Sequence, residues 1–167
     1  MRQLPPVVAG VDGNMLKLKT LEGIDFEFLG YLLTCHLVIE HHLDEFLTTL
    51  GTRLRWDAAK LTFSQKLALF PVEIFPRGGE MVAAIKHLNG LRNQVAHSIK
   101  SRGTDLNYKP LSDFLRLTYE GKRDVPTEPI TILEDFSSLV CNGLIGWVAS
   151  DAYRTNWRNE RDKSLEV

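Results

Sequence analysis

A long amphipathic segment near the N-terminus constrains the fold more than any other feature of the chain. From Ile24 to Leu50, apolar residues recur at helical spacing, which places them on one face of a single long α-helix. Gly51 favours a helix end at that point. Such a helix needs other elements to cover its apolar face, so the segment predicts a helical bundle. The apolar face consists of Phe28, Leu32, Cys35, Ile39, Leu43, Phe46 and Leu50.

Four later segments carry helix signals of different kinds. Thr62 followed by Gln65 matches a capping box, and Pro110 suits the first position of a helix. Gly90 weakens its helix by ~1 kcal/mol relative to alanine and favours a break or kink there. Residues 72–75, between two prolines, are expected to form a turn or a short strand-like piece. The expected helices cover residues 62–69, 80–99, 110–119 and 130–159.

These patterns predict an all-α fold, a bundle of four to five helices with a long C-terminal helix. Prolines and glycines punctuate residues 1–22, which we expect to form a loosely attached N-terminal arm. Residues 23–160 form the single predicted helical domain, and residues 161–167 form a charged tail.

The composition is that of an ordinary globular domain. The chain has 167 residues, a formal net charge of −1 and 44% hydrophobic residues, which argues against a membrane protein and against disorder. We expect neither a signal peptide nor a membrane span. Cys35 and Cys141 lack a CxxC spacing, so they predict buried thiols in a reducing cytoplasm. A disulfide between helices is the less favoured alternative.

Chemistry concentrates in residues 91–97, which read LRNQVAH. The guanidinium of Arg92 suits phosphate or carboxylate, and His97 can exchange protons near neutral pH. Asn93 lies four positions before His97 and shares its helix face. Arg92 and His97, five positions apart, point roughly 140° apart around a helix. Either the helix ends near Ala96, or the arginine bends round, or two chains combine.

The charges around this run favour a polyanionic ligand. Between Lys86 and Lys109 the chain has five cations and one acid. Glu40 lies among acids of the first amphipathic segment, and it is expected to pair with Arg92 across the bundle. From spacing alone, however, structural roles for Arg92 and His97 are favoured over catalytic ones.

The remaining histidines and aromatic residues favour structural roles. Adjacent His41 and His42 point about 100° apart on a helix, so a solvated face is favoured over a metal site. His36 and Glu40, four positions apart, fit a simple surface contact better than a ligand pair. The C-terminal aromatic series fits core or dimer surface better than a platform for nucleic-acid bases. That series is Trp147, Tyr153 and Trp157.

Residues 88–97, which read LNGLRNQVAH, resemble the signature of the HEPN superfamily. In this Rx4-6H signature an arginine is followed by a polar residue and later by histidine, here Arg92, Asn93 and His97. Residues 61–67, LTFSQKL, resemble the helix that precedes the signature in bacterial members.

The resemblance covers roughly residues 25–150 and implies a function. HEPN proteins are α-helical and usually homodimeric, and many are metal-independent endoribonucleases that act as toxins or defence effectors. By resemblance, His97 is the general acid/base, Arg92 binds the scissile phosphate and Asn93 supports it. RNA and an antitoxin are the implied partners, with no cofactor, and the products are a 2′,3′-cyclic phosphate and a 5′-hydroxyl. Weaker expectations are Glu40 orienting Arg92, and RNA contacts from Lys86, Lys100 and Arg102.

Two other functions remain open. The combination of LTFSQK and LRNQVAH also resembles the mannitol operon regulator family, which implies a non-catalytic protein that acts on transcription through a partner protein. The third is a HEPN-like domain whose cleft binds a nucleotide without cleaving it.

Overall fold

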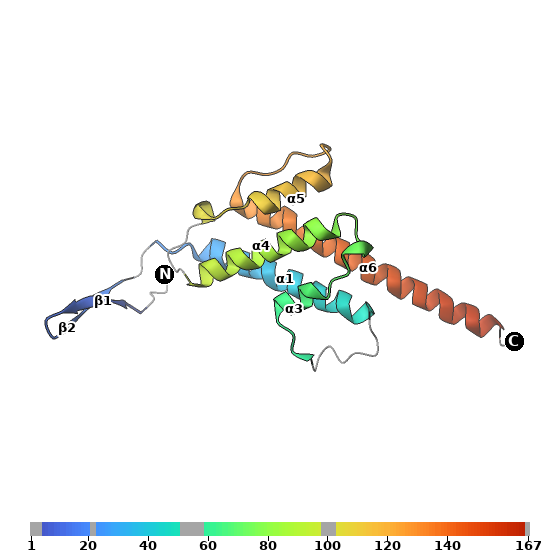
Figure 1. Cartoon of the computed structure of the whole chain (residues 1–167), viewed down its shortest axis with the longest axis horizontal. Helices are drawn as coiled ribbons and strands as arrows, with labels where there is room; N and C mark the ends of the chain where they lie inside the picture. The colour runs from blue at the N-terminus through green and yellow to red at the C-terminus, as the bar shows by residue number, and fades with distance from the viewer. Residues whose placement is uncertain (1–4, 21–22, 51–58, 98–102, 166–167) are drawn as a thin grey trace.

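The computed structural model describes residues 5–20, 23–50, 59–97 and 103–165, and within them it confirms the predicted all-α fold (Figure 1). An N-terminal hairpin precedes five described α-helices and two short 3₁₀ helices. The hairpin strands are β1 (Val7–Asp12) and β2 (Met15–Lys19). The helices are α1 (Phe26–Leu50), α3 (Phe63–Ala68), η1 (Val72–Ile74), α4 (Gly78–His97), η2 (Gly103–Asp105), α5 (Lys109–Tyr119) and α6 (Pro129–Leu165).

Helices α1 and α6 lie side by side at the centre and run in the same direction. The thiol of Cys35 lies 3.9 Å from the carbonyl oxygen of Leu133, and Phe46 packs edge-on against Trp147 further along both helices. α4 runs the opposite way across α1, and α5 covers the far side of α4 and α6 (Figure 1).

The core consists of the apolar face predicted for the first helix and the side chains that cover it. All of the predicted face is buried except Leu50, which is exposed at the last residue of α1. Fully buried partners come from the other helices. They include Ile85, Leu88, Leu111, Leu115, Leu133 and Phe136.

Three local predictions have different outcomes. The capping box is confirmed, since Thr62 and Gln65 bond reciprocally at the start of α3. The strand-like alternative for residues 72–75 is wrong, since Val72–Ile74 is a 3₁₀ helix. The break at Gly90 is also wrong: α4 passes through it unbroken, because the packing of this helix outweighs the weak propensity of glycine.

The N-terminal arm is a hairpin. β1 and β2 are antiparallel, with a register shift between Val8 and Gly10 and a left-handed Gly13 at the turn. In Figure 1 the hairpin stands away from the helices. The end of the chain also differs from expectation, because α6 continues through Leu165, into the predicted tail.

One part of α6, Pro129–Asp151, is long and apolar enough to cross a membrane by length and composition, contrary to our expectation. A third of it is buried inside the molecule, through residues such as Leu133, Phe136 and Leu144. A core helix of a bundle passes the same test, so this segment is weak evidence for a membrane protein.

Candidate functional site

All three signature residues lie in the C-terminal half of α4. Arg92 is half-buried, and its Nη1 donates a hydrogen bond to Oδ1 of Asn93 at 3.0 Å. Asn93 and His97 are exposed, and His97 is the last residue of α4. The helix therefore presents an anchored cation and an exposed imidazole less than two turns apart.

The continuous helix answers part of the angular question raised by the sequence. α4 is helical through Ala96 and ends at His97, close to the end that the first alternative expected, and it does not unwind between Arg92 and His97. Asn93 and His97 share a face, whereas Arg92 points well away from His97. Within the described part of one chain, no recorded hydrogen bond or ion pair joins Arg92 to His97.

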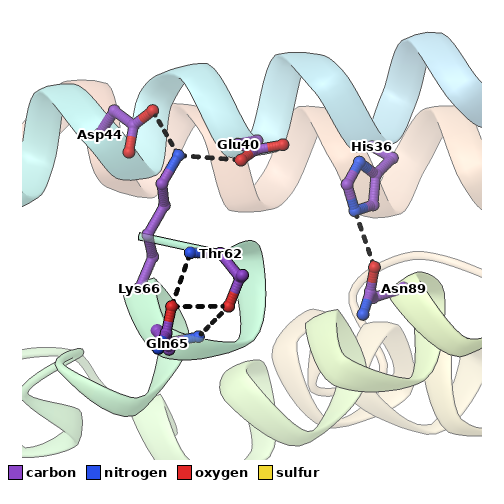
Figure 2. A network of polar contacts seen from close by, with 7 residues as sticks. All are labelled: His36, Glu40, Asp44, Thr62, Gln65, Lys66 and Asn89. Atoms are coloured by element: carbon purple, nitrogen blue, oxygen red, sulfur yellow. Dashed lines mark hydrogen bonds and ion pairs between the residues drawn. The ribbon is translucent and has the colours of Figure 1, made fainter. Parts of the chain in front are cut away.

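A buried histidine lies one turn away from the signature. His36 of α1 is 4% exposed, and its Nε2 donates to the amide oxygen of Asn89 in α4 at 3.0 Å (Figure 2). The ring also packs on Phe63 of α3, with centroids 4.4 Å apart. His36 therefore joins three helices, and the expectation of a surface contact with Glu40 is wrong.

Burial lowers the pKa of His36, because an imidazolium would lose its hydration there. The hydrogen bond to Asn89 and the charge of Glu40 oppose this shift, while the nearby charge of Arg92 adds to it. The other ring nitrogen, Nδ1, is buried without a hydrogen-bond partner. His36 is therefore a neutral structural imidazole at neutral pH.

Glu40 pairs with Lys66, not with Arg92 as predicted. Nζ of Lys66 lies 2.8 Å from Oε1 of Glu40 and 2.8 Å from Oδ2 of Asp44 (Figure 2). The capping box at Thr62 starts α3 so that Lys66 faces these two carboxylates of α1. The carboxylate that the sequence assigned to Arg92 is therefore paired with Lys66 of α3.

The predicted basic patch is only partly described. Lys86 is exposed on α4, whereas Lys100 and Arg102 lie outside the described residues. Lys109 pairs with Asp113 in α5. His87, next to Lys86, forms a hydrogen bond with the carbonyl oxygen of Asn107 at 2.7 Å and ties α4 to the segment before α5.

A group of possible metal ligands lies elsewhere, on the outer side of α1. Donor atoms of His41, His42 and Glu45 lie within 4.8 Å of one another. The angular objection from sequence is wrong here, since both rings turn towards Glu45, with N–O distances of 3.5 and 3.0 Å. The group is mostly exposed, as expected for polar side chains on a solvated helix face.

The cysteines and the described aromatic residue match the structural expectations. Cys35 and Cys141 are both buried free thiols. They line a cavity of about 330 Å³ between α1 and α6. Burial raises the pKa of Cys141 to about 11, so the thiol stays protonated. Trp147 packs on Phe46 and Phe75 within the core, while the side chains of Tyr153 and Trp157 lie outside the described part.

The link between His36 and Asn89 is the main feature that sequence reasoning missed. A signal was present, because His36 lies four positions after Leu32 and three before Ile39, in phase with the buried face of α1. A histidine in that phase predicts a buried ring with a hydrogen-bond partner.

Comparisons of the chain with protein-family models, with curated proteins and with solved structures found no match. The functional interpretation therefore depends on the residues of α4 and their surroundings.

Proposed function

We propose that the protein is a metal-independent endoribonuclease of HEPN type, a toxin or defence effector that acts as a cytoplasmic homodimer. The observation that carries this proposal is the arrangement of the signature on α4. Arg92 is half-buried and anchored by Asn93, and His97 is exposed at the end of the same unbroken helix. A guanidinium and an exposed imidazole are the two kinds of group that phosphate chemistry needs, and both are carried by this helix.

The proposed reaction is attack by the 2′-hydroxyl of RNA on the neighbouring phosphate. It requires a base for the hydroxyl, an acid for the departing 5′-oxygen and a cation for the charge that develops on phosphorus. One chain has one histidine in the signature. A two-fold dimer supplies two copies of His97, one as base and one as acid, together with two copies of Arg92.

The neighbours of Arg92 fit this role. A guanidinium has five N–H donors, and the bond to Asn93 uses one of them. The remaining fork can hold a phosphate. Lys86 is exposed on the same helix, and Lys100 and Arg102 follow it in the sequence. We propose that these three cations contact the RNA backbone, and that an antitoxin partner restrains the activity.

The test is cleavage of RNA by the purified protein in EDTA. We expect cleavage by the wild type with 2′,3′-cyclic phosphate ends. A general acid/base contributes about 10²–10⁴-fold to the rate of such a reaction. His97→Ala should therefore reduce the rate of RNA cleavage by that factor. His41→Ala is the matched control, because His41 is an exposed histidine on α1. If the wild type and His97→Ala behave alike on RNA and in a growth-toxicity assay, the nuclease proposal fails.

A non-catalytic regulatory protein, resembling the mannitol operon regulator family, is the second candidate function. The observation that favours it is the pair of exposed apolar side chains Leu33 and Leu37, which lie four positions apart on one face of α1, since exposed apolar surface marks protein interaction sites. An inactive wild type that recovers a regulatory protein in a pull-down would favour this candidate.

A further inference from the structure

The N-terminal hairpin has two different faces. Residues opposite each other on antiparallel strands share a face, and the register pairs Val8 with Leu18 and Val11 with Leu16. The register shift between Val8 and Gly10 brings both valines to the same side, although they are three positions apart. We call these four side chains the apolar hairpin face: Val8, Val11, Leu16 and Leu18.

The opposite face of the hairpin is the more polar one. Lys17 pairs with Asp12 at 2.8 Å, and Lys19 lies on the same side. Met15, opposite Asp12, and Val7, opposite Lys19, also lie on this face. The hairpin is therefore amphipathic, like a sheet that has one side in water and one side against a core.

Nothing in the described part of the chain covers the apolar hairpin face. Its four side chains are between 60% and 67% exposed, and the hairpin stands away from the helices (Figure 1). An isolated two-stranded hairpin is marginally stable in water and needs a surface to pack against. The amphipathic pattern therefore points to a covering surface from outside this chain.

Helix α1 carries the matching surface. Phe26, Leu33 and Leu37 are 42–58% exposed. They lie seven and four positions apart, so they share one face of the helix. We call these three residues the α1 stripe. An α-helix lying on one face of a sheet is a standard way to bury both.

The two surfaces match in length and in charge. The five residues of β2 extend about 17 Å, and the α1 stripe rises about 17 Å from Phe26 to Leu37. α1 contains four acidic residues and no lysine or arginine, whereas the hairpin has two lysines and one acid. The lysines lie on the opposite face of the hairpin, so these charges favour the approach of the two elements without a direct ion pair.

We propose that the apolar hairpin face of one copy packs on the α1 stripe of a second copy, with both hairpins exchanged around a two-fold axis. Each dimer would contain this contact twice. The hairpin and the N-terminal end of α1 lie at the same end of the molecule as the C-terminal end of α4 (Figure 1), so the exchange would bring the two copies of His97 to one side of the dimer. The contact itself does not depend on catalysis.

The first experiment measures the mass of the full-length protein by analytical ultracentrifugation over a range of concentrations. We expect a wild-type dimer, and we expect Leu16→Asp and Leu37→Asp each to raise the dissociation constant at least about tenfold, because each buries an unpaired charge. Met15→Asp, on the polar face, and Leu117→Asp, at an exposed position of α5, are the matched controls and should remain dimeric. Circular dichroism checks that every variant is folded.

The second experiment tests which copy holds the hairpin. Leu16→Cys and Leu37→Cys are made as separate proteins and mixed under mild oxidation. A covalent dimer that forms in the mixture, well above either protein alone, supports the exchange. The proposal is overturned if the wild type is a monomer at every concentration, or if the aspartate variants dimerise like the wild type. A double variant that crosslinks only within one chain also overturns it.

These outcomes are separate from those of the nuclease test. If Leu16→Asp dissociates the dimer but the wild type never cleaves RNA, the hairpin exchange is supported and the nuclease proposal is rejected. If the wild type cleaves RNA but neither Leu16→Asp nor Leu37→Asp weakens the dimer, the nuclease proposal is supported and the hairpin exchange is rejected.

Discussion

At the scale of single residues, His36 makes stability depend on pH in a direction that the structure determines. In the unfolded chain its imidazole takes up a proton near pH 6.5, its ordinary pKa, whereas burial lowers its pKa in the folded protein. Below that pH the unfolded state binds more protons, so folding stability is full above about pH 6.5 and is lost as the pH falls towards the folded pKa.

The variant His36→Gln tests this assignment, because glutamine has an N–H donor for Asn89 but does not titrate. We expect the loss of unfolding free energy between pH 7.5 and pH 5.5, measured by urea denaturation, to be smaller in the variant than in the wild type. His41→Gln changes an exposed histidine and serves as the control. Equal pH dependence in His36→Gln and the wild type would contradict the assignment.

At the scale of elements, the start of α4 depends on one glycine. A Cβ at Gly78 would collide with the carbonyl oxygen of Val72 in η1, whereas a Cβ at Gly79 would meet nothing within 4 Å. Gly78→Ala should therefore cost about 1–3 kcal/mol of unfolding free energy through overpacking. Gly79→Ala should gain about 0.5–1 kcal/mol, since alanine is the better helix residue. Thermal or urea unfolding of the pair measures both, and a neutral Gly78→Ala would mean that η1 can move aside.

Elements with local signals could be predicted from the sequence. The long helix followed from its apolar period, and α3 followed from a capping box between residues three apart. The hairpin could not be predicted from the sequence, because the register shift between Val8 and Gly10 interrupts the alternation of side chains between the two faces of β1. The continuity of α4 at Gly90 was missed because packing, which a sequence pattern does not show, decides it.

The candidate site divides in the same way. The spacing of the signature correctly placed Arg92, Asn93 and His97 on one helix. The pairing of Glu40 with Lys66 joins residues 26 apart and depends on how α3 crosses α1, which no local pattern encodes. Whether two copies of His97 meet remains a prediction.

At the scale of the whole molecule, the proposed dimeric site has a consequence for mixtures. An excess of the inactive double variant Arg92→Ala/His97→Ala should capture wild-type chains in mixed dimers, each with only half of the catalytic groups. We therefore expect RNA cleavage per wild-type chain to fall several-fold. The same double variant carrying Leu16→Asp should inhibit much less, because it dimerises poorly. Unchanged cleavage in a proven mixed dimer would show that one chain suffices.

The pairing of α1 with α6 also affects how the chain can fold during synthesis. Cys35 contacts Leu133, 98 positions later, so the first helix leaves the ribosome long before the helix that covers it. Until then the part of its apolar face that packs on α6 has no cover, and a nascent chain that stops before Pro129 leaves that part exposed. Contacts this distant in sequence slow folding and expose intermediates to aggregation. The fold can therefore be completed only after α6 has been synthesised, and until then the exposed face of α1 is available to chaperones that bind apolar helices.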